Sequence, residues 1–284
     1  MAESVLKSPA VLKFDTDFFT KSSLKPEGVI DTGVCGDIVV ASLLDKPEWK
    51  FIVKKFSLLD EERVPRNKTM FNREVKFMQS VRHPFLVKCI YAAECPGYLA
   101  ICMKYYYSRT LNFHVGNIDL SLSEQCVVQV ACALRYLHKN NLVHLDVKLD
   151  NVFVDGQHNA ILGDFGLALE MPAGQQTLKA RNIGGTFGYL SPEIMKAAAE
   201  TEIDPYKLDC YSLGVVLWSL VFQRAPKQAV NYYFETRKTR DLQENIRDML
   251  LRLLERDPAR RVTIADFLHR VRRDSIYRNI IDTN

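Results

Sequence analysis

Apolar residues follow two different patterns along the chain, and the change lies near Tyr105–Arg109. Before it, short β-rich runs such as Phe51–Phe56 predict strands. The segment 69–80 is an exception, because apolar residues recur there at helical spacing and predict a helix. After the change, helical repeats dominate. The pattern therefore predicts a strand-rich part followed by a helix-rich part.

The first helix of the second part is predicted by its start signal. Ser121–Glu124 has the sequence of a capping box, and apolar residues continue at helical spacing through Leu137. With 284 residues, 47% of them hydrophobic, the chain is long for one core and has enough apolar residues for two. We therefore expect two lobes with the functional site between them.

Cysteine usage and charge distribution indicate an intracellular protein. The seven cysteines form no C-x-x-C pair, and an odd number suits reduced thiols, so we expect no structural disulfide. Cys35 lies between two glycines, and the sequence leaves open whether it is redox-sensitive or only a small exposed residue. No apolar stretch reaches about 18 residues and the first twenty residues carry several charges, so we expect neither a membrane span nor a secretory signal.

The strongest chemical signal is the polar stretch 144–151, followed by an Asp-Phe-Gly tripeptide that begins at Asp164. Mg²⁺ is a hard cation that prefers carboxylate and amide oxygens, which Asp164 and Asn151 supply. Asp146 is placed to orient an incoming hydroxyl and receive its proton, and Lys148 can hold phosphoryl oxygens as a point charge. Together these groups predict phosphoryl transfer from a polyphosphate.

These two motifs resemble the H-R-D-x-x-x-x-N catalytic loop and the D-F-G metal motif of eukaryotic-type protein kinases. The resemblance implies use of ATP and Mg²⁺ and an α+β fold of two lobes: a small β-rich N-lobe with one main helix, and a larger helical C-lobe. The implied domain covers 27–284, after a lead-in of 1–26. Within it, the N-lobe is 27–104, the linker 105–109 and the C-lobe 110–284.

The resemblance also assigns N-lobe residues. Lys54 matches the lysine of the third strand, with Lys55 facing solvent, and Glu74 matches its carboxylate partner on the helix. Gly33 and Gly36 match two glycines of the phosphate-covering loop, but the family's first glycine is replaced by Asp31 here. A carboxylate near a triphosphate adds repulsion, so we expect weakened nucleotide affinity.

The nucleotide base is expected between apolar side chains, with its edge against the backbone of the linker. By similarity to the family, these positions are Ile30, Ile38, Ile52, Met103, Tyr105 and Phe153.

Downstream segments resemble the C-lobe of the same family. Arg261 matches the arginine that pairs with Glu193 at the end of the activation segment, and Asp209 matches the aspartate that caps catalytic-loop amides. Small-molecule kinases of the superfamily lack this set, so the resemblance implies a protein substrate. Lys148 and Thr186 resemble the serine/threonine branch, and Thr186 is expected to bond Asp146 or Lys148.

One departure from the family changes the expected regulation. Leu145 stands where an arginine usually binds a phosphate on the activation segment, and leucine cannot do so. We expect an enzyme that is active without activation-segment phosphorylation, with 164–193 held by packing. The compact size and irregular glycine loop resemble divergent kinases of large DNA viruses, such as the insect baculovirus protein kinase. That resemblance implies a basic virion or DNA-packaging protein as substrate.

Two other functions stay open at this point. A pseudokinase would bind nucleotide or partners without transferring phosphate, although every catalytic polar group is present. Basic residues between two C-lobe helices could instead form a nucleic-acid-binding module or a solvated face. These residues are Arg224, Lys227, Arg237, Lys238 and Arg240. The sequence also leaves open homodimer formation and a cytoplasmic, nuclear or virion location.

Overall fold

The computed structural model describes residues 11–33, 36–228, 230–273 and 275–283. Cys35 and the first ten residues of the expected lead-in lie outside the described residues. The chain divides into two compact units. The first unit contains the residues through Arg82 together with Val87–Tyr105, and the second contains His83–Leu86 and the residues from Tyr106 onward.

A six-stranded sheet forms the first unit, counted over its described residues. Its strands are β1 (Leu12–Lys13), β2 (Leu24–Gly33), β3 (Gly36–Leu43), β4 (Lys46–Ser57), β5 (Cys89–Cys95) and β6 (Tyr98–Lys104), in the order β1-β5-β6-β4-β3-β2. β1 pairs in parallel with β5, and the other neighbours are antiparallel. This sheet confirms the β-rich lobe that the sequence predicts.

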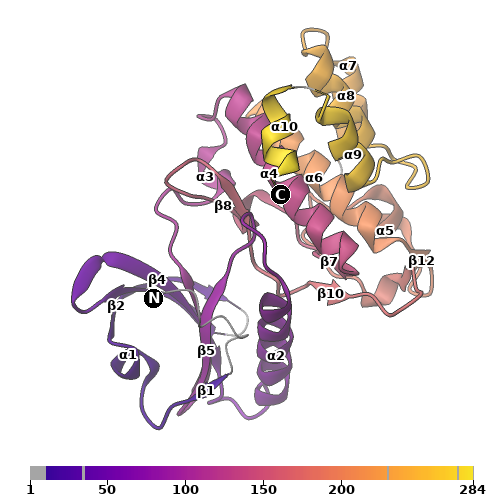
Figure 1. The fold of residues 1–284 in the computed structure, drawn as a ribbon. Helices are drawn as coiled ribbons and strands as arrows, with labels where there is room; N and C mark the ends of the chain where they lie inside the picture. Colours follow the sequence, from indigo (N-terminus) through magenta and orange to yellow (C-terminus); the bar gives the residue numbers. More distant parts are fainter. Residues whose placement is uncertain (1–10, 34–35, 229, 274, 284) are drawn as a thin grey trace. The chain divides into compact units, whose positions relative to one another are not determined.

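Helix α2 (Val64–Ser80) packs on the sheet and runs alongside β5 (Figure 1). It begins five residues before the predicted helix, with Pro65 in its first turn, where a missing N–H costs nothing. Its buried face contains Phe71, Val75 and Met78, as the helical spacing predicts. The helix therefore delivers Glu74, which is 2% exposed, to the interior of this unit.

Part of the expected lead-in belongs to the first unit. Helix α1 (Phe18–Lys21) is capped by Asp17 and buries Phe18 and Phe19 in the core beside the sheet. Tyr98 fixes this segment, because its hydroxyl accepts from the Phe18 N–H and donates to Asp17. The sequence left open whether a helix of the lead-in lies on a lobe or on a partner, and the structure places α1 on the first unit.

The second unit is mainly helical. Its helices are α3 (Leu111–His114), α4 (Leu120–Lys139), α5 (Pro192–Lys196), α6 (Pro205–Phe222), α7 (Tyr232–Lys238), α8 (Glu244–Leu253), α9 (Ile264–Val271) and α10 (Ser275–Asp282). α4 packs against α6, and α8, α9 and α10 surround this pair (Figure 1). α6 is apolar on nearly all sides, which agrees with its position in the core.

The predicted capping box is wrong in its position. α4 begins at Leu120, and the side chain of Asp119 accepts from the Leu122 N–H, so Asp119 is the N-cap. Glu124 accepts a hydrogen bond from Asn245 on α8. Aspartate and serine are equally good N-caps, so neighbouring candidates cannot be ranked from sequence. None of the described helices is long and apolar enough to cross a membrane.

Short strand pairs position the polar segments of this unit. They are β7 (Leu142–Val143) with β10 (Leu169–Glu170), β8 (Val152–Val154) with β9 (Ala160–Leu162), and β11 (Leu178–Lys179) with β12 (Glu202–Ile203). The stretch 144–151 lies between β7 and β8 and ends in the 3₁₀ turn η1 (Leu149–Asn151). A further turn, η2 (Ala180–Asn182), follows β11. Both ends of the polar loop are therefore anchored in strands.

Candidate active site

One buried carboxylate anchors the start of the polar loop 144–151 by hydrogen bonds to its backbone. Asp209 on α6 is 1% exposed and accepts hydrogen bonds from the N–H groups of His144 (2.9 Å) and Leu145 (2.8 Å). His138, in the last turn of α4, adds a third contact at 2.9 Å through Nε2. Leu145 has φ of 63°, a left-handed conformation that is unfavourable for a branched side chain. The expected capping role of Asp209 is present in the structure.

His144 orients the next residue of the loop. Its Nδ1 accepts from the Asp146 N–H at 3.3 Å, and its Nε2 lies 3.1 Å from the carbonyl oxygen of Gly163. A neutral ring with the proton on Nε2 satisfies both contacts. Burial lowers the pKa of His144, which favours this neutral form. The ring also meets Phe165 edge-on, with centroids 5.5 Å apart, and so joins this loop to the Asp-Phe-Gly segment.

Asp146 is the centre of a hydrogen-bonded network. Its Oδ2 accepts from Asn151 Nδ2 at 2.9 Å and lies 2.8 Å from Lys148 Nζ, while its Oδ1 accepts from the Thr186 hydroxyl at 2.6 Å. Lys148 also donates to the Thr186 oxygen at 3.0 Å. These contacts confirm the prediction that Thr186 bonds Asp146 or Lys148. These contacts hold the Asp146 carboxylate in one orientation, and the residue is 8% exposed.

Asn151 and Asp164 form an oxygen donor set that suits Mg²⁺. Asn151 directs its Nδ2 to the carbonyl and carboxylate oxygens of Asp146, which leaves Oδ1 as the acceptor available to a cation. The Gly163 N–H donates to the Asn151 carbonyl oxygen at 2.8 Å and brings the next residue, Asp164, toward Asn151. No group of three or more His, Cys, Asp or Glu ligands occurs among the described residues. A cation held here would therefore take its other ligands from phosphate and water, as Mg²⁺ commonly does.

The predicted ion pair of the first unit is present. Lys54 Nζ on β4 lies 3.0 Å and 2.8 Å from the two carboxylate oxygens of Glu74 on α2. β4 lies between β3 and β6, with Lys54 opposite Ile38 and Ile101, so the strand is fixed on both sides. Lys55, expected to face solvent, is half-buried and its ammonium lies 4.1 Å from the ring centroid of Tyr98. The long aliphatic stem of lysine allows such packing, which a polar residue type alone does not predict.

The expected glycine loop is partly described. Gly33 and Gly36 face each other across the end of the β2–β3 pair. Gly36 has φ of 149°, and a Cβ there would lie 2.6 Å from the Lys55 carbonyl oxygen. Glycine is therefore required at this position by the close approach to β4, independently of any phosphate.

The residues expected around the base occur in both units. Ile30, Ile38, Ile52 and Met103 lie on strands β2, β3, β4 and β6 of the first unit. Ile52 and Met103 are paired across β4 and β6, and Ile30 is 60% exposed. Tyr105 ends this unit, and its N–H bonds the Lys50 carbonyl oxygen at 3.3 Å. Phe153 belongs to the second unit, where it stacks on Tyr106 with ring centroids 5.4 Å apart.

Leu145 lies in an apolar cluster with the segment that follows Asp164. Its buried members are Val143, Leu145, Met171, Ile203 and Leu208, and the partly buried residues packed on them include Leu167, Leu169, Leu178 and Ile183. The β10–β7 and β11–β12 pairs tie the same segment by backbone hydrogen bonds. Thr177, a hydroxyl-bearing residue of the same segment, is exposed.

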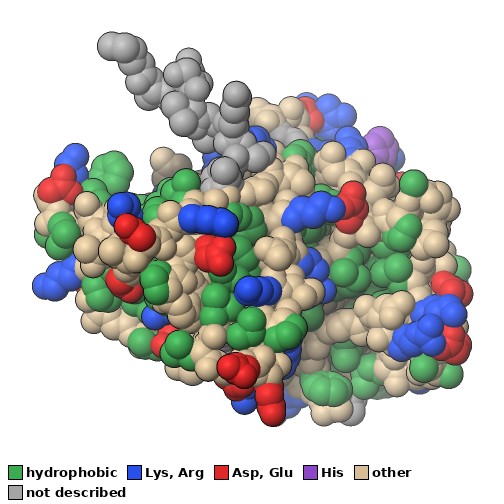
Figure 2. All heavy atoms as spheres, turned by 90° about the horizontal axis from the view of Figure 1, so that it is seen from below, with side chains coloured by type: hydrophobic (Ala, Val, Ile, Leu, Met, Phe, Trp, Pro, Cys, Tyr) green, Lys and Arg blue, Asp and Glu red, His purple; other side chains and the backbone are tan. Residues whose placement is uncertain are grey.

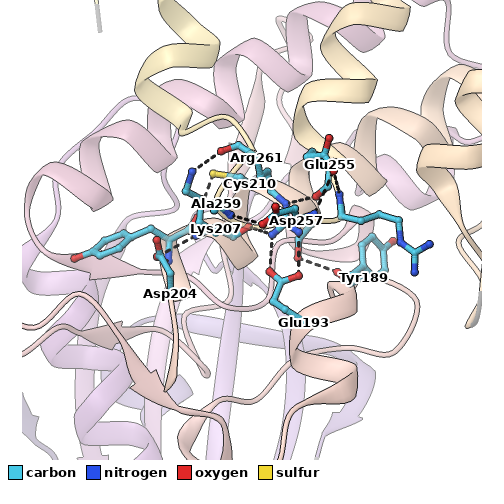
Figure 3. Close-up of polar contacts among 12 residues, drawn as sticks. Tyr189, Glu193, Asp204, Lys207, Cys210, Glu255, Asp257, Ala259 and Arg261 are labelled. Atoms are coloured by element: carbon cyan, nitrogen blue, oxygen red, sulfur yellow. Dashed lines mark hydrogen bonds and ion pairs between the residues drawn. The ribbon is translucent and has the colours of Figure 1, made fainter. Parts of the chain in front are cut away.

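The end of that segment is fixed by the predicted pair of Glu193 and Arg261, drawn in Figure 3. Arg261 donates to both carboxylate oxygens of Glu193, at 2.6 Å and 2.9 Å. Its guanidinium also donates to the carbonyl oxygens of Lys207 and Glu255 and lies over the ring of Tyr211. A fully buried arginine requires such complete pairing, because an unpaired buried charge is costly.

Two residues of the site were not among the predicted site residues. His138 contacts Asp209 from α4, and Tyr189 accepts from the Leu149 N–H at 3.2 Å through its hydroxyl. His138 contacts a carboxylate and Tyr189 bonds a backbone N–H, and in both cases the partner belongs to a distant segment of the chain. The available indication was that Tyr189 lies within the expected activation segment, 164–193.

Comparison with known proteins identifies the class. Residues 27–271 match the family model described as protein kinase domain, so the chain belongs to the protein kinase family. This finding confirms the resemblance and the two-lobed α+β fold class.

Particular relatives are similar at low identity. Rhodopsin kinase GRK7 of Homo sapiens is 30% identical over 200 residues, 66% of this chain and 35% of that protein. Protein kinase C delta type of Rattus norvegicus is 26% identical over 250 residues, 83% of this chain and 36% of that protein. A protein of Acanthamoeba polyphaga mimivirus, named as a serine/threonine-protein kinase or receptor, is 28% identical over 211 residues, 72% of this chain and 12% of that protein. The chain thus spans at most 36% of the length of these three relatives.

Proposed function

We propose that the chain is a serine/threonine protein kinase that transfers the γ-phosphoryl group of ATP to protein hydroxyls. The observation that carries this proposal is the network around Asp146, which joins a carboxylate, an ammonium and a hydroxyl within 3.0 Å. Phosphoryl transfer needs mainly positioning and charge stabilisation, and this network supplies both. Similarity to the mimivirus protein named as a serine/threonine-protein kinase or receptor supports the choice of hydroxyl.

Each predicted residue has a role in this proposal. Asp146 orients the substrate hydroxyl and accepts its proton, and Lys148 neutralises charge on the transferred phosphoryl oxygens. Asn151 and Asp164 hold Mg²⁺, which neutralises charge on the phosphates when bound. Lys54, oriented by Glu74, binds the phosphates of the nucleotide.

The same proposal includes activity without phosphorylation of the activation segment. Leu145 cannot bind a phosphate, and instead it packs with Leu167, Leu169 and Ile183 of that segment. Packing and the two strand pairs replace the charge contact that phosphorylation would supply. Treatment with a phosphatase should therefore leave the rate of transfer within about twofold of the untreated protein. Loss of most of the activity would contradict this part of the proposal.

Transfer of γ-phosphate from Mg²⁺-ATP to separate pools of basic and acidic proteins tests the main proposal. The parent chain should label serine and threonine, with the basic pool preferred if the resemblance to viral kinases extends to substrate choice. Asp146→Asn and Asp164→Ala should each abolish transfer. Asp150→Asn is the matched control, because Asp150 is exposed in the same loop and bonds only Asn112 among the described contacts. Nucleotide binding without transfer by the parent would instead establish a pseudokinase.

A further inference from the structure

A recessed basic pocket lies in the second unit, away from the Asp146 network. It has a volume of about 410 Å³ and is formed by the start of α6, the end of α8, the loop 259–262 and the last turn of α9. Six cationic residues line it: Lys207, Arg252, Arg260, Arg261, Arg270 and Arg273. His269 adds a titratable ring, and Asp266 is the only carboxylate in the lining described for this pocket.

Some of these cations are already neutralised. Arg261 is paired with Glu193, and Arg252 donates through Nε to both oxygens of Asp248. Lys207 donates to the carbonyl oxygen of Arg261. These contacts hold the wall of the pocket in place and account for part of its charge.

The remaining cations are not balanced. Arg260 lies 3.9 Å from Glu255 and its side chain is 74% exposed, so this pair contributes little. The guanidinium groups of Arg270 and Arg273 make no hydrogen bond or ion pair with another described residue. Asp266 is engaged locally by the hydroxyl of Thr263, at 2.7 Å. The pocket therefore has several guanidinium N–H donors that can bind an anion.

The predominance of arginine over lysine around this pocket indicates which kind of anion it suits. From Thr239 to the end of the sequence, the chain contains arginines but no lysine. The planar guanidinium matches the spacing of phosphate oxygens and bonds them in pairs, whereas an ammonium acts as a point charge. Several guanidiniums around one cavity are therefore suited to a compact dianion such as a phosphoryl group.

We propose that this pocket binds a phosphoryl group of a phosphorylated peptide segment. A nucleic acid would need a continuous basic groove that follows its backbone. The pocket is instead a local hollow whose lining includes Asp266. Basic and acidic side chains are also interspersed on the face drawn in Figure 2, so no continuous basic stripe crosses that face. The proposal does not involve Asp146 or its partners, so it stands apart from the phosphoryl-transfer activity.

Fluorescence anisotropy at physiological salt tests the proposal with a labelled peptide that carries two phosphoserines. The same peptide with serines, and with glutamates, should bind at least about tenfold more weakly, because neither offers a tetrahedral dianion. Arg270→Ala should weaken phosphopeptide binding about tenfold, and Arg270→Lys should restore it only in part. Arg270 is exposed, so the variant should keep the melting temperature of the parent.

Arg272→Ala is the matched control, because it removes the same charge two residues away. Arg272 is paired with Asp282 and does not line the pocket, so this variant should change binding by less than about twofold. Equal binding by the parent and Arg270→Ala would overturn the proposed location. Tighter binding of a single-stranded oligonucleotide, or of inorganic pyrophosphate, would overturn the phosphopeptide in favour of a nucleic acid or a free anion.

Discussion

Asp209→Asn should destabilise the protein far more than its small chemical change suggests. Oδ2 of Asp209 accepts from the His144 N–H and contacts His138 Nε2, while Oδ1 accepts from the Leu145 N–H at 2.8 Å. An asparagine has one oxygen and one NH₂ group. Whichever way the amide turns, its NH₂ group faces at least one N–H donor.

The expected loss follows from this geometry. The best orientation of the amide keeps the contacts with His144 and His138 and loses the bond to Leu145. One charge-assisted hydrogen bond contributes about 1.5–3 kcal/mol, and the two that are kept become weaker because the acceptor is neutral. The lost bond also held Leu145 in a left-handed conformation, which is itself unfavourable by about 1–2 kcal/mol. We expect the free energy of unfolding to fall by about 3 kcal/mol.

Denaturant unfolding measured by tryptophan fluorescence gives this free energy. Asp204→Asn is the control, because it makes the same substitution at the N-cap of the same helix. Asp204 accepts from the N–H groups of Tyr206 and Lys207, and asparagine caps helices as well as aspartate, so we expect a change below about 0.5 kcal/mol. Equal losses in the two variants would refute the argument that Asp209 holds the loop through its charge and two oxygens.

Three further predictions concern single residues. Thr186→Val removes the hydroxyl that bonds Asp146, so the turnover number should fall at least about tenfold, with Thr186→Ser retaining most of the rate in the same transfer assay. Gly214→Ala should lower the free energy of unfolding by about 1–3 kcal/mol, although alanine favours helices, because its Cβ would lie 2.8 Å from Leu253 Cβ; unchanged stability in denaturant would contradict this. Burial lowers the pKa of His144, so the unfolded chain takes up a proton that the folded protein excludes. The free energy of unfolding should therefore fall as the pH drops below about 6.5, and His144→Gln should show a shallower slope in the same titration.

Residue types in a fixed spacing made much of the site predictable. The pairs Lys54–Glu74 and Glu193–Arg261 join segments far apart in the chain, and only the family resemblance related their members. Short β-rich runs and helical spacing predicted the strand-rich and helix-rich parts, because residue preference and burial of one helix face leave these patterns in the sequence. The predicted N-cap of α4 was two residues too late, since Asp119 and Ser121 are both good caps.

Contacts that depend on distant packing were not predictable. The sequence shows what Leu145 lacks, a charge that could bind phosphate, but not what its side chain contacts. In the structure it lies in one apolar cluster with Val143, against which Leu167 and Ile183 of the following segment pack. An arginine at this position would either bury its guanidinium in that cluster or turn its side chain out of the cluster and lose the packing. An unpaired buried charge is unfavourable by several kcal/mol. The same substitution that removes a phosphate-binding group thus makes the unphosphorylated packing more stable.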